Sequence, residues 1–72
     1  MEIELIREVV KYFSELNPDK ADLIDEEQSG VNLLGIVYLK DKDGNDLLRI
    51  KKDDIGTYHL KQKTEKQRHR TN

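Results

Sequence analysis

The stretch VNLLGIVYLKDKDGNDLLRIKK, residues 31–52, decides the fold because two runs of strand-forming residues flank a polar turn. Residues 31–40 are rich in β-branched and aromatic side chains and uncharged until Lys40, which predicts a strand. Residues 47–52 resume the alternation of apolar and polar side chains. Asp43-Gly44 between them is a favoured two-residue type I′ turn. We therefore expect an antiparallel hairpin.

The register of this hairpin follows from the position of the turn. A two-residue loop makes one face aliphatic throughout, which is what a half-buried sheet requires. The pairs expected on that face are Leu39 with Leu48 and Val37 with Ile50. The pairs expected on the opposite face are Tyr38 with Arg49 and Ile36 with Lys51.

A third strand is predicted after a second turn at residues 53–56. A three-residue loop over residues 54–56, with Gly56 in the left-handed conformation, would make a G1-bulge hairpin. That loop sets Ile50 opposite Leu60 and Lys52 opposite Tyr58, whereas a four-residue loop would set Ile50 opposite His59. The hydrophobic pattern selects the shorter loop. The expected core face consists of Val31, Leu33, Val37, Leu39, Leu48, Ile50, Tyr58 and Leu60.

Residues 2–16 carry apolar side chains at spacings of three and four, which predicts an amphipathic helix that covers this core face. The helix should end near Asn17, because Pro18 disfavours a helical conformation at the residue before it. Residues 18–28 leave two alternatives open. One is a second helix with Asn17 as its N-cap and Pro18 at its first position, and the other is an acidic edge strand around residues 21–25.

The predicted fold class is therefore α+β: an N-terminal helix packed on a three-stranded antiparallel meander, with a short second helix. A four-stranded sheet is the alternative. This order resembles the first part of a double-stranded-RNA-binding domain, whose closing helix, with its basic start, the sequence does not show.

Charge divides the chain at residue 60. Residues 1–60 hold eight Lys or Arg against fourteen Asp or Glu, whereas residues 61–72 hold five against one. No apolar residue follows Leu60, so we expect a single domain over residues 1–60 and a mobile basic tail over residues 61–72.

Composition excludes several classes of protein. The chain has no Cys, which excludes a disulfide-stapled secreted domain and a thiolate metal site. No apolar run approaches the roughly 18–20 residues that span a bilayer, and the acidic start lacks the features of a signal peptide. We expect a soluble, cytoplasmic protein without membrane contact.

The sequence predicts no enzyme, cofactor or metal site. Residues 41–46 superficially resemble a calcium loop, but Gly44 falls at position four and Lys52 at position twelve, where an EF-hand needs Gly at six and Glu at twelve. His59 and His69 have no third ligand at a recognisable spacing. The serines and Thr57 lack a nucleophile-elbow context, and the four glycines stand singly.

The second face of the sheet is the strongest candidate binding surface, because one helix cannot cover both faces. We expect a non-catalytic interaction or assembly module, of the kind found among phage and bacterial accessory proteins, that self-associates as a homo-oligomer or docks on another protein there. Residues 18–28 could also fold over this face. The candidate interface residues are Leu34, Ile36, Tyr38, Leu47, Arg49 and Lys51.

The alternative function is a nucleic-acid-associated regulator that uses the tail. Five cations could neutralise up to about five phosphates without reading sequence. The acidic body would repel a polyanion. The candidate tail residues are Lys61, Lys63, Lys66, Arg68 and Arg70.

Overall fold

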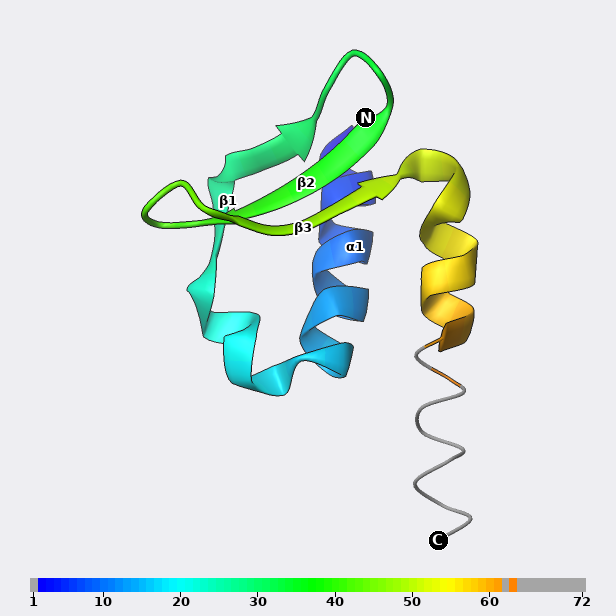
Figure 1. The fold of residues 1–72 in the computed structure, drawn as a ribbon, viewed down its shortest axis with the longest axis horizontal. Coiled ribbons are helices and arrows are strands. Elements are labelled where there is room, and N and C mark those ends of the chain that lie inside the picture. The colour runs from blue at the N-terminus through cyan, green and yellow to red at the C-terminus, as the bar shows by residue number, and fades with distance from the viewer. Residues whose placement is uncertain (1, 62, 64–72) are drawn as a thin grey trace, which may run out of the picture.

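The computed structural model describes residues 2–61 and 63, and it has the expected α+β class (Figure 1). The α-helix α1 spans Glu2–Leu16, and a 3₁₀-helix at Pro18–Leu23 follows it. The strands β1 (Ile24–Val31), β2 (Ile36–Asp41) and β3 (Asp46–Lys51) form an antiparallel sheet in the order β1-β2-β3. A short 3₁₀-helix at Lys52–Asp54 leads into helical residues 55–61 and 63.

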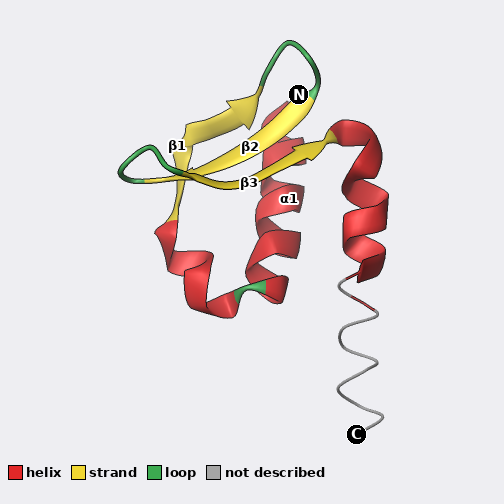
Figure 2. Ribbon diagram, in the orientation of Figure 1, coloured by secondary structure: helices red, strands yellow, loops and turns green. Residues whose placement is uncertain are grey.

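The core lies between one face of the sheet and two helical segments. The helix α1 lies behind the sheet, and the C-terminal segment lies next to α1 (Figures 1 and 2). The rings of Tyr12 and His59 stack with their centroids 4.3 Å apart, so the C-terminal segment is held against α1. The buried core residues are Val9, Phe13, Val37, Leu39 and Ile55. Two come from α1, two from β2 and one from the start of the C-terminal segment.

The register predicted for the central hairpin is confirmed at all four pairs from Ile36–Lys51 to Leu39–Leu48. The predicted type I′ turn is wrong. The loop has three residues, because the Asp41 N–H donates to the Asn45 carbonyl and only Gly44, at φ +83°, has a positive φ there. A bulge between Leu39 and Lys40 in the pairing then adds one residue to β3 and restores the register.

The third strand predicted for residues 57–60 is wrong, because these residues are helical. Ile55 is buried and Tyr58 is half-buried against the core, while His59 stacks on Tyr12, which is a helical spacing of three and four. Leu60, expected in the core, is 63% exposed, and Gly56 has no positive φ. Residues 55–61 and 63 therefore form a helical segment that packs on the core, where a strand was predicted.

The first strand also begins and ends elsewhere than predicted. Residues 31–40 are broken by a turn at residues 32–35, so Val31 ends β1 and Leu33 is exposed. Residues 18–28 combine both alternatives, since a 3₁₀-helix is followed by an edge strand. Asn17 occupies the N-cap position of that helix and Pro18 lies in its first turn, as predicted, but the Asn17 side chain makes no capping hydrogen bond. Its Nδ2 donates to the Phe13 carbonyl at 3.2 Å instead.

Candidate interaction surface

The two hairpin turns are built on the same pattern, Asn or Asp followed three residues later by Gly. Asn32 Oδ1 accepts the N–H groups of Leu34 and Ile36 at 2.9 and 3.1 Å. Asp41 Oδ1 likewise accepts the N–H groups two and four residues on, both at 2.9 Å. In each turn the glycine N–H donates to the carbonyl of the capping residue at 3.0 Å, and the glycine has a positive φ. Both turns are thus type I turns closed by a G1 bulge.

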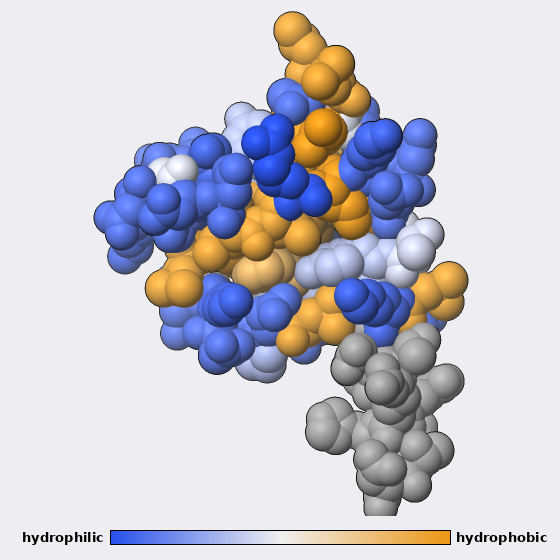
Figure 3. Space-filling view, viewed as in Figure 1, coloured by the Kyte–Doolittle hydropathy of each residue, from blue (hydrophilic) through white to orange (hydrophobic). Residues whose placement is uncertain are grey.

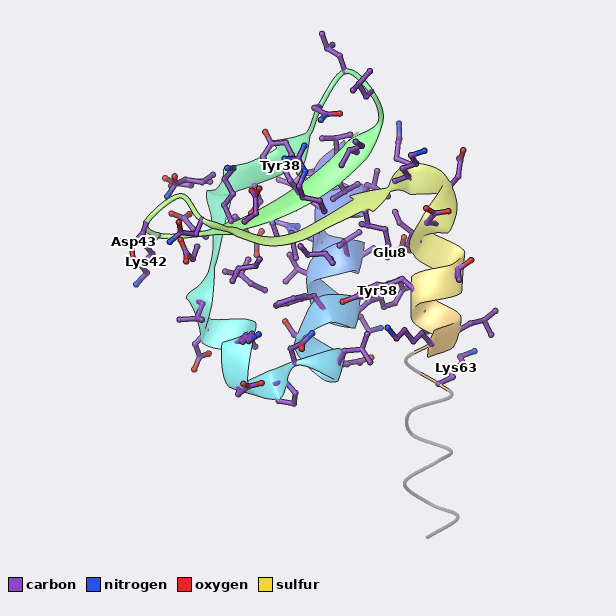
Figure 4. The ribbon with its side chains drawn as sticks, viewed as in Figure 1. Glu8, Tyr38, Lys42, Asp43, Tyr58 and Lys63 are labelled. Carbon is purple, nitrogen blue, oxygen red and sulfur yellow. The ribbon has the colours of Figure 1, made fainter. Side chains whose placement is uncertain are left out.

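The two turns differ at their central residues. Lys42 and Asp43 are the polar tip of the β2–β3 turn (Figure 4), as is usual for a solvated hairpin. The β1–β2 turn instead carries Leu33, which is 105% exposed, and Leu34, which is 82% exposed. Figure 3 shows this apolar tip projecting from the top of the molecule. We call Leu33 and Leu34 the leucine tip.

The outer face of the sheet, turned away from α1, adjoins the leucine tip. On β2, Ile36 and Tyr38 alternate with the fully buried Val37 and Leu39, and therefore point outward. Their partners on β3 are Lys51 and Arg49. The outer face consists of Ile36, Tyr38, Lys40, Asp46, Arg49 and Lys51. Next to the tip it consists of Ile36 beside Lys51, and toward the opposite turn it consists mainly of charged residues.

The charged end of the outer face is tied together by Asp46. Its carboxylate lies 3.1 Å from Lys40 Nζ and 3.5 Å from a guanidinium nitrogen of Arg49. The hydrogen bond from Lys40 is the main reason that the pKa of Asp46 is lowered, and the positive charges of Lys40 and Arg49 act in the same direction. An open hollow of about 410 Å³ lies here, with Tyr38, Lys40 and Arg49 among its lining residues.

Tyr38 also lies against β1. A Cβ added at Gly30 would come within 2.9 Å of Tyr38 Oη, so only glycine leaves room for the ring in this position. The Lys40 ammonium lies 5.9 Å from the centroid of the same ring. Tyr38 is therefore held by its own sheet, and its outward side is the part of it that a partner can reach.

The structure brings four of the six candidate interface residues to the outer face, namely Ile36, Tyr38, Arg49 and Lys51, and it places Leu34 on the adjoining tip. Leu47 packs against the core instead, because the bulge in β3 turns it to the same side as Leu48. Leu33 was not among the candidate interface residues, because a continuous strand over residues 31–40 would place it on the core face. Its signal was the repeated spacing of Asn32 to Gly35 and Asp41 to Gly44.

Of the candidate tail residues, Lys61 and Lys63 are exposed and helical, whereas Lys66, Arg68 and Arg70 lie outside the described residues. In the stretch 41–46, which superficially resembles a calcium loop, the Asp41 carboxylate accepts two N–H groups of its own turn. Across residues 2–61 and 63, no three His, Cys, Asp or Glu side chains are grouped so that they could hold a metal ion.

Comparison with known proteins identifies no relative: no family model, curated protein or solved structure matches the chain. Within the described part of the chain, no helix has the length and apolar character needed to cross a membrane.

Proposed function

We propose that this protein is a small non-catalytic interaction module that self-associates through the leucine tip and the adjoining Ile36. The observation that carries the proposal is the exposure of two consecutive leucines on a turn that the same chain elsewhere builds with Lys and Asp. Exposed leucines in a contiguous patch mark interaction sites in small soluble proteins.

The geometry of the turn favours binding because the backbone that carries the leucines needs little ordering when a partner arrives. Asn32 fixes the turn through two hydrogen bonds, and Gly35 holds the left-handed conformation that closes it. A surface that is already rigid loses less conformational entropy on association.

The test is the solution mass of the full chain over a range of concentrations, measured by sedimentation equilibrium. The informative variant is Leu33→Lys/Leu34→Asp, which gives the β1–β2 turn the same central residues as the β2–β3 turn. Because that sequence already occupies the same turn geometry, the variant should fold normally. We expect it to be monomeric at concentrations where the wild type associates.

The matched control is Lys42→Ala/Asp43→Ala in the polar turn, which should leave the association of the wild type unchanged. Association that survives the leucine-tip variant would contradict the proposal. A wild type that stays monomeric up to millimolar concentration would exclude self-association.

Nucleic-acid binding is the second candidate, and one observation favours it. Lys61 and Lys63, the two candidate tail cations that the structure describes, are exposed on the helical segment that follows the sheet. Asp53 and Asp54, just before that segment, carry the opposite charge. A mobility shift with duplex RNA or DNA at low salt, where phosphate contacts are strongest, tests this candidate, and no shift would exclude it.

A further inference from the structure

The sheet has two edges, and within the part of the chain that the structure describes their regularity differs. Edge strands offer unpaired main-chain groups to other chains, and natural proteins usually block them. Within the described residues, β1 and β3 each pair with β2 alone, so each has one side without a strand partner.

The β1 edge is blocked by an interruption of its own pairing. The register between β1 and β2 shifts between Asp25 and Gly30, and the exposed Glu26 and Glu27 lie in that shift. Ser29 Oγ fills the gap in the ladder, since it accepts the Lys40 N–H at 3.0 Å and donates to the Asp25 carbonyl at 2.8 Å. An irregular, acidic edge of this kind does not accept another strand.

The β3 edge is regular from Leu48 to Lys51, and its hydrogen-bonding phase can be assigned. The Lys52 N–H donates to the Gly35 carbonyl at 3.0 Å, so position 52 bonds toward β2. In an antiparallel ladder every second residue bonds to the same neighbour. Ile50 and Leu48 therefore also bond toward β2, while the N–H groups of Arg49 and Lys51 and the Arg49 carbonyl point to the open edge. The Lys51 carbonyl belongs to the N-cap of the 3₁₀-helix that follows.

The side chains along this edge define the chemistry of its partner. Arg49 and Lys51 lie on the outer face and are exposed, whereas Leu48 and Ile50 point to the core side. Leu48 and Ile50 are only half-buried, although Val37 and Leu39 of the neighbouring strand are fully buried. Figure 3 shows apolar surface alongside β3, so the core is incompletely covered at this edge.

We propose that the β3 edge binds an extended segment of another protein in which acidic and apolar side chains alternate. The segment would add a strand to the sheet, with its acidic side chains opposite Arg49 and Lys51 and its apolar side chains over Leu48 and Ile50. A second copy of β3 does not fit. When two copies of β3 pair antiparallel with their apolar side chains on the same face, Arg49 lies opposite either Arg49 or Lys51 of the other copy, so like charges face each other.

This proposal uses a surface other than the leucine tip, so its outcome is independent of self-association. The probe is a capped octapeptide of alternating Glu and Val, titrated into the full-length leucine-tip variant by calorimetry. The control peptide replaces every Glu with Lys. We expect binding of the Glu–Val peptide that is at least about tenfold tighter than that of the Lys–Val peptide, because charge pairing selects between them.

The decisive protein variant is Lys51→Pro compared with Lys51→Ala. Both remove the charge, but only proline removes the edge N–H, and φ of Lys51 is −71°, which proline adopts without strain. The N–H of Lys51 makes no bond to β2, so the urea midpoints of both variants should agree. We expect the proline variant to bind the Glu–Val peptide at least about tenfold more weakly than the alanine variant.

A second reagent tests main-chain pairing without changing the protein. N-methylation of alternate peptide nitrogens, in the phase that faces β3, should abolish binding, whereas methylation in the other phase should not. Equal binding by the proline and alanine variants, equal binding of both methylated peptides, or no binding of the Glu–Val peptide would overturn the proposal.

Discussion

Asn32 is the residue on which the leucine tip depends. Its side-chain oxygen accepts two main-chain N–H groups of the turn, and its own N–H donates to the Ile36 carbonyl at 3.0 Å. We expect Asn32→Ala to lower the free energy of unfolding by about 1 kcal/mol, the usual contribution of such hydrogen bonds. Urea denaturation measures this change. An unchanged midpoint would show that the turn does not need its cap.

Two glycines should respond to alanine in opposite directions. Gly44 has φ +83°, where a Cβ is strained, so Gly44→Ala should destabilise the protein by about 1–2 kcal/mol. Gly56 is helical, and a Cβ there would meet nothing within 4 Å, so Gly56→Ala should stabilise it by about 0.5–1 kcal/mol. Thermal unfolding of both variants checks the pair. Destabilisation by Gly56→Ala would contradict a helix at this position.

Asp46 should make stability depend on pH in the acidic range. Its pKa is lowered from the ordinary value of 3.8, mainly by the hydrogen bond from Lys40, so the unfolded chain takes up a proton before the folded one does. Its contribution is therefore complete above pH 3.8 and is lost as the pH falls through the lowered pKa. The stability difference between wild type and Asp46→Asn should shrink over this range in urea melts. A difference that is constant with pH would mean that the ion pair does not contribute.

The C-terminal helical segment is the element that most distinguishes the structure from the sequence prediction. In the predicted hairpin Ile55 is a loop residue and Leu60 a core residue, whereas in the structure Ile55 is buried and Leu60 is mainly exposed. Ile55→Ala should therefore cost about 2–4 kcal/mol of unfolding free energy, and Leu60→Ala less than about 1 kcal/mol. Chemical denaturation of both variants compares them. A larger loss of unfolding free energy for Leu60→Ala than for Ile55→Ala would contradict the helical segment and support the predicted hairpin.

The central hairpin could be predicted because its pattern has one consistent solution. The register expected from a turn at Asp43-Gly44 puts Val37, Leu39, Leu48 and Ile50 on a single face, and the structure has that register even though its turn differs. The loop is one residue longer than predicted, and the bulge in β3 offsets that residue. The hydrophobic pattern therefore predicts the strand pairing but not the type of turn.

The remaining elements could not be predicted because local patterns there fit two structures. Residues 57–60 are too few to separate a strand from a helix, and the contact that decides between them, the stacking of Tyr12 on His59, joins distant parts of the chain. The mainly apolar stretch from Val31 to Leu39 likewise fits a single strand, so the turn that begins at Asn32 was not predicted. Ile36, Tyr38, Arg49 and Lys51 therefore lie on the sheet face for which they were predicted, whereas Leu33, the most exposed residue of the turn, was assigned to the core.

At the scale of the whole molecule, the charge distribution determines how association should respond to salt. The Lys52 side chain lies beside the β1–β2 turn, with its Cδ 3.8 Å from where a Cβ of Gly35 would be, and Lys51 adjoins it. Two copies that meet at their leucine tips bring these cations together. Salt screens that repulsion and leaves the apolar contact intact, so association should strengthen with ionic strength.

Sedimentation equilibrium of the wild type and of Leu33→Lys/Leu34→Asp, each at low and high salt, tests self-association through the leucine tip most directly. We expect the average mass of the wild type to rise with concentration, more steeply at high salt, while the variant stays monomeric in both. Equal masses of the two proteins at every concentration would contradict a docking role for Leu33 and Leu34.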